Sequence, residues 1–269
     1  MKWWRQLRAF ARATLHTSLV LVPLWVALTA RLPWLRVVAV LVTSVGVALL
    51  IRAAFIYVPG FDPFFRVPWR GPRAGRRIAI TFDDGPNGAA TEAVLDLFAK
   101  HGAKATFFMV GKNVEAQPEL ARRVAAAGHA VGSHTYSHQK LSRVPLAAAI
   151  AEVDRGHQCL VDAGLPAPKL FRAPHGLKTF GLVRHLDRRG IQAIAWTAGL
   201  YDTDCPSADI IARRAVRWIR PGVILLLHDG KLGHDRSPML GALDRILTMC
   251  RERNLTPVTV PELLGERRT

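Results

Sequence analysis

The chain has 269 residues and half of them are hydrophobic, which suits one large domain or one domain with an appendage. Its formal net charge is +17, but it carries no nucleic-acid recognition motif and no basic-aromatic alternation, which argues against a nucleic-acid partner. The three cysteines, Cys159, Cys205 and Cys250, lack the spacing of a disulfide framework and favour a reducing compartment.

Two apolar stretches without charge, residues 14–30 and 37–51, occupy the N-terminal region. Each is near the lower length limit for crossing a bilayer, and the second reaches full length if Arg52 directs its guanidinium to the interface. We therefore predict a membrane region over residues 1–58, with two helices at about 14–30 and 34–58. No small-residue cleavage site stands out, which disfavours a secretory signal peptide.

Positive charge gathers around this region, because residues 1–77 hold twelve Lys or Arg and a single acid. Residues 59–76 are rich in Pro, Gly and Arg and are expected to form a basic interfacial linker. With two spans, the basic N-terminus and the linker both lie inside, as the positive-inside rule prefers. This predicts a multi-pass protein of a bacterial-type inner membrane, with membrane lipids as partners and the C-terminal region in the cytoplasm. A single span would instead place that region outside.

From Arg77 onward, short strand-like runs alternate with amphipathic helical ones. The strand-like runs are 77–82, 105–111, 129–134, 169–174, 192–197, 223–228 and 256–260. Such alternation predicts an α/β fold with a largely parallel sheet, and about seven strands favour a barrel over an open sheet.

Five of the predicted strands end in polar motifs: TFDDG, GSHTYSH, FRAPHG, AWTAGLYDTD and LLLHDG. Active sites of parallel barrels assemble at the C-terminal ends of the strands. Five strand ends that carry His, Asp or Arg are not what core packing produces. The motifs therefore predict one shared active site.

Metal ligation is the first chemistry that these motifs suggest. His134 and His138 are four residues apart, so one helical turn would place both imidazoles on one face. One carboxylate added to them gives a two-His, one-Asp set with open coordination positions. The adjacent Asp83 and Asp84 then take different jobs, one as ligand and the other as base.

A base alone would leave the departing group unprotonated, so the site also needs an acid. His228 of LLLHDG lies at the end of a different predicted strand and fits that role. Arg172 is placed to hold the catalytic aspartate by a bidentate contact.

In this order, the motifs resemble those of the NodB-homology polysaccharide deacetylases over residues 77–264, with residues 265–269 left as a tail. The resemblance implies a distorted (β/α)7-type barrel, preceded here by the N-terminal hydrophobic membrane-anchoring region. TFDDG then implies Asp83 as the general base and Asp84 as a metal ligand. HTYSH implies His134 and His138 as the remaining protein ligands.

RAPHG resembles the third motif of the family, which implies that Arg172 orients Asp83 and that the backbone amide of His175 helps to bind the oxyanion. The fourth motif places an Asp six residues after a Trp, an interval kept by Trp196 and Asp202. Asp202 is therefore expected to brace Arg172, and Trp196 to lie at the substrate and oxyanion pocket.

The L-x-H motif implies His228 as the general acid and Leu226 in the wall of the acyl pocket. The resemblance also implies one divalent metal, most often zinc, with cobalt, nickel or manganese as alternatives. The reaction would be hydrolysis of an N-acyl group, usually acetyl, from an amino sugar. Thr203 departs from the Trp common in members that act on polysaccharides, and Asp204 offers a competing alignment with the fourth motif.

The substrate depends on the side of the membrane. A tethered cytoplasmic barrel suggests an N-acylated amino sugar that is lipid-linked or part of a glycolipid. A barrel outside suggests peptidoglycan or an exported polysaccharide. An inactive membrane-tethered binding module and an amidohydrolase of a small non-sugar amide are the remaining alternatives.

Overall fold

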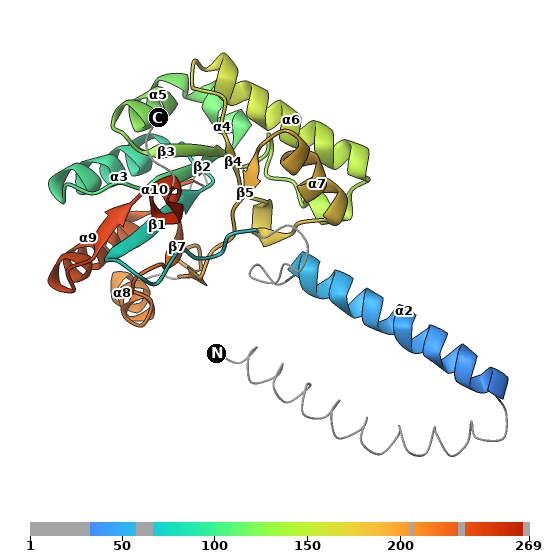
Figure 1. Ribbon diagram of the computed structural model, residues 1–269. Coiled ribbons are helices and arrows are strands. Elements are labelled where there is room, and N and C mark those ends of the chain that lie inside the picture. The colour runs from blue at the N-terminus through green and yellow to red at the C-terminus, as the bar shows by residue number, and fades with distance from the viewer. Residues whose placement is uncertain (1–32, 58–66, 205–206, 231–234, 266–269) are drawn as a thin grey trace. The chain divides into compact units, whose positions relative to one another are not determined.

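The computed structural model describes residues 33–57, 67–204, 207–230 and 235–265 (Figure 1). The chain divides into two compact units, 1–53 and 54–269. Helix α2 (Pro33–Tyr57) contains the stretch Trp34–Ala54, which has a mean hydropathy of 2.3 and no buried residue. Among the described residues it is the one helix long and apolar enough to cross a membrane. The other predicted membrane helix, 14–30, lies outside the described residues.

The second unit is built on a sheet of eight strands in which every described strand pair is parallel. The strands are β1 (Arg77–Asp83), β2 (Thr106–Met109), β3 (Ala130–Ser133), β4 (Leu170–Phe171), β5 (Gln192–Ala193), β6 (Ala198–Gly199), β7 (Ile224–His228) and β8 (Thr256–Val258). Their order is β5-β4-β3-β2-β1-β7-β6, and β8 pairs with the first residues of β1. This parallel α/β half-barrel agrees with the predicted fold class.

The barrel is distorted where the segment 192–199 crosses it. This segment pairs with β4 at its start as β5 and with β7 at its end as β6. The sequence predicted a single strand over 192–197, which is wrong. Between the two pairings the chain leaves the ladder, and Ile194 and Thr197 donate backbone hydrogen bonds to Phe171 and Ile224.

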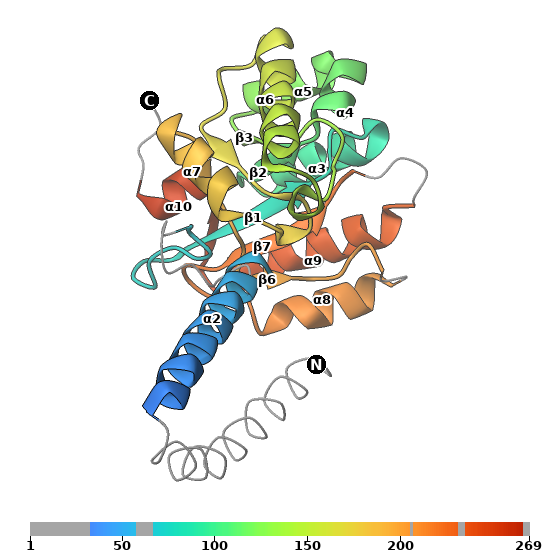
Figure 2. The same ribbon diagram turned by 90° about the vertical axis from the view of Figure 1, so that its right-hand side faces the viewer.

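Helices cover the outer face of the curved sheet, and α10 packs against its inner face. The helices are α3 (Gly88–Lys100), α4 (Gly111–Ala116), α5 (Pro118–Ala126), α6 (Leu146–Asp162), α7 (Phe180–Arg188), α8 (Ala208–Val216), α9 (Ser237–Glu252) and α10 (Val260–Leu264). Figure 2 shows α8 and α9 side by side below β1 and α5 and α6 above it, and all four helices contribute to one core cluster with Ile78, Ile80 and Phe82. Because both faces are covered, β1 is an almost unbroken apolar run, and Ile78, Ile80 and Phe82 have no exposed surface.

Aromatic packing links the sheet to its helices. The ring of Phe82 stacks on Phe107 with centroids 5.2 Å apart and meets Phe98 of α3 edge-on at 5.8 Å. Burial of large side chains such as these dominates the stability of such a core. It also fixes the end of β1, and with it the direction in which Asp83 leaves the sheet.

Candidate active site

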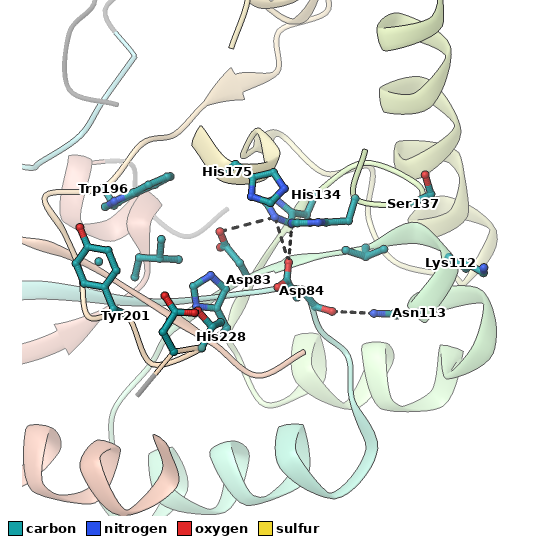
Figure 3. Close-up of a pocket in the computed structure, with 16 residues that line it drawn as sticks. Asp83, Asp84, Lys112, Asn113, His134, Ser137, His175, Trp196, Tyr201 and His228 are labelled. Atoms are coloured by element: carbon teal, nitrogen blue, oxygen red, sulfur yellow. Dashed lines mark hydrogen bonds and ion pairs between the residues drawn. The ribbon is translucent and has the colours of Figure 1, made fainter. Parts of the chain in front are cut away.

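A cavity of about 730 Å³ opens at the C-terminal ends of the strands. The register of β1 and β7 places Asp83 directly beside His228 at its floor. Figure 3 shows Asp83, Asp84, His134 and His228 directed into this cavity. The cavity is lined by Asp83, Asp84, Val110, Lys112, Asn113, His134, Ser137, His138, His175, Trp196, Gly199, Tyr201, Thr203, Asp204, Leu226 and His228.

Asp84, His134 and His138 bring one ligand atom each to a common point, with all three atoms within 4.8 Å of one another. The Oδ1 atom of Asp84 lies 3.4 Å from His134 Nε2 and 3.1 Å from His138 Nε2. His134 Nδ1 lies 2.8 Å from the carbonyl oxygen of Arg172, which leaves Nε2 to face the cluster. Asp84 Oδ1 is buried without a hydrogen bond, as a ligand atom awaiting a cation would be. The three residues fit one divalent metal ion.

The route by which the two histidines converge differs from the sequence argument. They do not share a helical turn, because residues 134–140 form an irregular loop. Thr135 and His138 both have left-handed backbone angles, with φ of 68° and 61°. The loop also lies against Gly156 of α6, where an added Cβ would be 2.3 Å from the carbonyl carbon of Thr135. The four-residue spacing identified His134 and His138 as a pair, but the strained backbone of the loop directs their side chains to a common point.

Electrostatics in the cluster favour an ionised Asp84. Burial alone would raise the pKa of this carboxyl, but the facing imidazoles of His134 and His138 hold it well below its usual range. Across the cluster, burial and then the charges of His138 and Lys140 lower the pKa of His175. The cluster therefore offers an anionic carboxylate to a cation.

Asp83 forms a buried ion pair with Arg172, as the sequence predicted, but through one nitrogen and not by the bidentate contact that was expected. Arg172 Nη1 donates to Asp83 Oδ1 at 2.7 Å and to Thr81 Oγ1 at 2.7 Å. The guanidinium has no exposed surface, lies 4.0 Å over the ring of Phe108 and donates to two backbone carbonyls that follow β5. Asp83 Oδ2 is directed elsewhere, 3.8 Å from His134 Nε2. One oxygen is fixed and the other faces the metal cluster.

Asp202 pairs with His228, and the expected contact between Asp202 and Arg172 is wrong. Asp202 Oδ1 lies 2.9 Å from His228 Nδ1, and Oδ2 accepts the backbone N–H of His228 at 2.9 Å. Burial alone would lower the pKa of His228, but the hydrogen bond and charge of Asp202 raise it to about 9, with smaller contributions from Asp83 and Asp84. Asp202 of the fourth motif therefore contacts His228 and not Arg172.

Two buried residues that the sequence analysis did not single out support the same loops. Asp229 is fully buried, accepts a hydrogen bond from Thr91 Oγ1 at 2.5 Å, and has its pKa raised to about 7, above all by burial. Arg236 donates from Nε and Nη2 to the carbonyl of Gly230 at 2.9 and 2.6 Å, and its Nη1 lies 4.0 Å from Asp202 Oδ2. The sequence could have indicated Asp229, because it follows His228 directly in the LLLHDG motif. Arg236 belongs to no motif that we identified.

The remaining predicted site residues, His175, Trp196 and Leu226, line the cavity. His175 has a left-handed φ of 56°, and its ring centroid lies 4.8 Å from that of His138. The side chain of Asn113 donates to the backbone carbonyl of Asp84 at 2.7 Å (Figure 3). Tyr201 lies at the cavity edge with two thirds of its surface exposed.

Comparison with known proteins is consistent with this arrangement. Residues 70–194 match the family model described as polysaccharide deacetylase. The chain is 40% identical over 181 residues to a chitooligosaccharide deacetylase of Bradyrhizobium sp. (strain ANU 289), covering 66% of this chain and 83% of that relative. It is 35% identical over 205 residues to a peptidoglycan-N-acetylglucosamine deacetylase of Bacillus cereus, covering 76% and 95% of the two chains.

Solved structures of the same family also share the fold of this chain. The peptidoglycan N-acetylglucosamine deacetylase Bc1960, solved in complex with a naphthalenyl N-oxidanyl-benzamide, superposes with a TM-score of 0.72 at 30% identity, covering 76% of this chain and 94% of that one. BA3943 of Bacillus anthracis, described as a CE4 family pseudoenzyme, superposes with a TM-score of 0.69 at 25% identity, covering 78% and 72%. The fold thus occurs in both active and inactive proteins, and the side chains of the site must carry the functional argument.

Proposed function

The chain belongs to the polysaccharide deacetylase family, and on that premise we propose that it hydrolyses the N-acetyl group of N-acetylglucosamine units in an oligo- or polysaccharide. Its similarity to the curated deacetylases identifies it as a carbohydrate deacetylase, a hydrolase of carbon–nitrogen bonds. One observation carries the assignment of roles: two oriented pairs, Asp83–Arg172 and His228–Asp202, meet at the floor of one cavity beside a three-ligand cluster.

Asp83 is proposed as the general base. Arg172 fixes its Oδ1, so that the free Oδ2 is the atom that accepts a proton from the attacking water. His228 is proposed as the general acid that protonates the departing amine. Its Nδ1 is held by Asp202, which leaves Nε2 for the substrate, and a pKa of about 9 keeps the ring protonated at neutral pH.

Asp84, His134 and His138 are proposed to hold a divalent cation, zinc being the first choice for a site of two imidazoles and one carboxylate. When bound, such an ion polarises the amide carbonyl and lowers the pKa of water. His175 follows Pro174 in a strained turn at the edge of the cavity, which supports its backbone amide as a donor to the developing oxyanion. Leu226 and Trp196 form walls against which the small acyl group fits.

The saccharide class rests on the relatives, which are named for chitooligosaccharide and peptidoglycan. A cavity open at the strand ends suits a sugar within a chain as well as one at its end. The apolar helix α2 supports a membrane-anchored enzyme, and it is the observation that favours a lipid-linked saccharide as a second candidate. That second candidate, together with a multi-pass arrangement and a cytoplasmic active site, also depends on residues 14–30.

One experiment on the purified, zinc-loaded full chain distinguishes the proposed base, Asp83, from the proposed metal ligand, His134. We expect Asp83→Ala to keep its bound zinc and to lose about 10²–10⁴ in kcat on an N-acetylated chitooligosaccharide. We expect His134→Ala to lose the zinc itself, measured by elemental analysis, with activity lost as a consequence. An Asp83→Ala variant that retains most of its rate would show that the base is another group. Absence of deacetylation by the wild type would refute the proposed activity.

A further inference from the structure

A cluster of arginine and tryptophan side chains lies at the end of the barrel opposite the active site. This Arg–Trp patch comes from the segment that precedes β1 and from the end of α8 with the turn that follows it. Its members are Trp69, Arg70, Arg73, Arg76, Arg77, Arg217, Trp218 and Arg220. Neither contributing segment, 67–77 or 213–223, contains an acidic residue.

Backbone contacts join the two segments into one surface. Arg70 forms an antiparallel bridge with Val223, and Gly71 donates to the carbonyl of Gly222 at 2.8 Å. Gly222 in turn donates to the carbonyl of Arg77 at 2.9 Å. The patch is therefore fixed to the first residues of β1 and β7 and not carried on a free loop.

The side chains of the patch are arranged for an anionic, partly apolar partner. The guanidinium groups of Arg217 and Arg220 lie 5.2 and 5.4 Å from the ring of Trp218, and that of Arg70 lies 5.3 Å from the ring of Trp69. Trp69 is 38% exposed. Guanidinium groups bind phosphates bidentately, and tryptophan is enriched where water meets lipid headgroups.

The two segments supply no acidic side chain that could neutralise the positive charge of the patch. Burial, followed by the charges of Arg73 and Arg220, lowers the pKa of Arg70. Mutual repulsion of this kind is relieved when anions bind between the cations. A surface of anionic phospholipid provides such anions, and each basic residue near it gains favourable energy.

The position of the patch in the chain indicates which anionic surface is within reach. Only nine residues, 58–66, separate Tyr57, the last residue of α2, from Val67. Even fully extended, nine residues span only about 30 Å. If α2 enters a bilayer, the headgroup surface of that same bilayer is continuously available to the patch.

We propose that the Arg–Trp patch docks the catalytic unit on anionic phospholipid headgroups, with the active-site cavity facing away from the bilayer. The direction follows from β1, which begins at Arg77 in the patch and ends at Asp83 in the cavity. Seven residues of strand separate the two by about 20 Å. Resting on the proposed deacetylation, this orientation assigns the site a saccharide that approaches from the aqueous side, and argues against a sugar held at headgroup depth by its own lipid.

The full chain, reconstituted in vesicles, tests the docking by hydrogen–deuterium exchange. Vesicles of phosphatidylcholine alone are compared with vesicles that also contain phosphatidylglycerol. We expect the anionic lipid to slow exchange in peptides from 67–77 and 213–223 by about fivefold for each arginine engaged, and high salt to reverse the effect. Peptides from the cavity loop 134–140 are expected to remain unchanged.

A matched pair of variants assigns the effect to the patch. Arg217→Gln/Arg220→Gln is expected to reduce the protection that phosphatidylglycerol gives by about 25-fold, which is fivefold for each arginine removed. Arg122→Gln/Arg123→Gln on α5 removes the same charge and is expected to retain it. Equal exchange in the two lipids, or protection of the cavity loop instead of the patch, would overturn the proposal.

Activity measurements keep this test separate from the proposed function. Turnover of a water-soluble chitooligosaccharide by Arg217→Gln/Arg220→Gln in detergent is expected to equal that of wild type. In anionic vesicles, wild type is expected to turn over the soluble substrate in preference to a polyprenyl-linked N-acetylglucosamine, and the reverse preference would overturn the orientation. If neither sugar is deacetylated, the proposed function fails, while the exchange data still decide whether the patch docks.

Discussion

Two charged pairs, Asp83–Arg172 on the proposed base side and His228–Asp202 on the proposed acid side, are held by different surroundings. Asp83 and Arg172 lie at the ends of β1 and β4, and the guanidinium is completely buried between aromatic rings and backbone carbonyls. His228 ends β7, and its partner Asp202 comes from a loop in which Tyr201 has a left-handed φ of 54°. The strands of the sheet fix the positions of Asp83 and Arg172, whereas contacts of an irregular loop bring Asp202 to His228.

The difference follows the demands of the two roles. A base whose free oxygen must meet one water molecule gains from a rigid, desolvated setting. An acid must reach the departing nitrogen of the substrate, and His228 retains 21% exposure of its side chain at the cavity. We therefore expect changes on the base side to cost stability together with activity, and changes on the acid side to shift pH dependence more than stability.

Arg172→Met is expected to have the largest effect. It leaves Asp83 as a buried charge without a partner, which should lower the free energy of unfolding by about 3–5 kcal/mol and abolish turnover. Urea denaturation and kcat measure the two effects. The double variant Asp83→Asn/Arg172→Met should recover part of the stability but none of the activity. A loss below about 1 kcal/mol in the single variant would mean that the pair does not hold the base side together.

Gly156→Ala tests how the metal cluster is supported. Alanine normally stabilises a helix interior relative to glycine, but here its Cβ would lie 2.3 Å from the backbone of Thr135. We expect a loss of about 1–3 kcal/mol in unfolding free energy and weaker zinc binding, measured by chelator competition. Gly181→Ala on α7 is the control, since its nearest neighbour is the movable end of Leu146. Unchanged zinc affinity in Gly156→Ala would mean that the packing of loop 134–140 against α6 does not support the metal cluster.

Asp202→Asn addresses the acid side. In its proposed role as acid His228 must be protonated, so we expect activity below its pKa of about 9 and a fall as the pH rises through that value. Without the charge of Asp202, burial dominates and the pKa falls. If it reaches the ordinary value of about 6.5, kcat at pH 7.5 drops roughly tenfold and the alkaline limb of the pH profile moves down by about 2.5 units. An unmoved limb would assign that limb to a group other than His228.

The two sides also differ in how far the sequence predicts them. Asp83, Asp84 and His228 end runs of apolar residues, so the alternation of strands and helices predicts that they share one end of the barrel. The partner of Asp202 could not be predicted in this way. The interval from Trp196 identifies the residue, but the direction of a side chain in an irregular loop depends on backbone angles that no hydrophobic period encodes.

The same limit applies to His134 and His138, whose four-residue spacing indicated a shared helical face although a strained loop brings them together. Sequence periodicity also missed the break within 192–199, because the apolar residues there continue across the point at which the chain changes neighbours. Periodicity therefore predicts strands and their order. Contacts that cross from loop to loop require the folded structure.

Arg236→Gln is expected to have the smallest effect and makes the comparison sharper. Arg236 Nη1 lies 4.0 Å from Asp202 Oδ2, so its positive charge partly offsets the negative charge that Asp202 presents to His228. Without it, protonated His228 is better stabilised, and the alkaline limb should move upward, opposite to its movement in Asp202→Asn. We expect a shift below about one unit and only a few-fold change in kcat, since the hydrogen bonds from Arg236 to Gly230 hold the loop as well. Arg236→Lys, which keeps the charge, should leave the limb in place even if the loop loosens. A downward shift in Arg236→Gln would mean that Arg236 acts by positioning Asp202 and not by its charge.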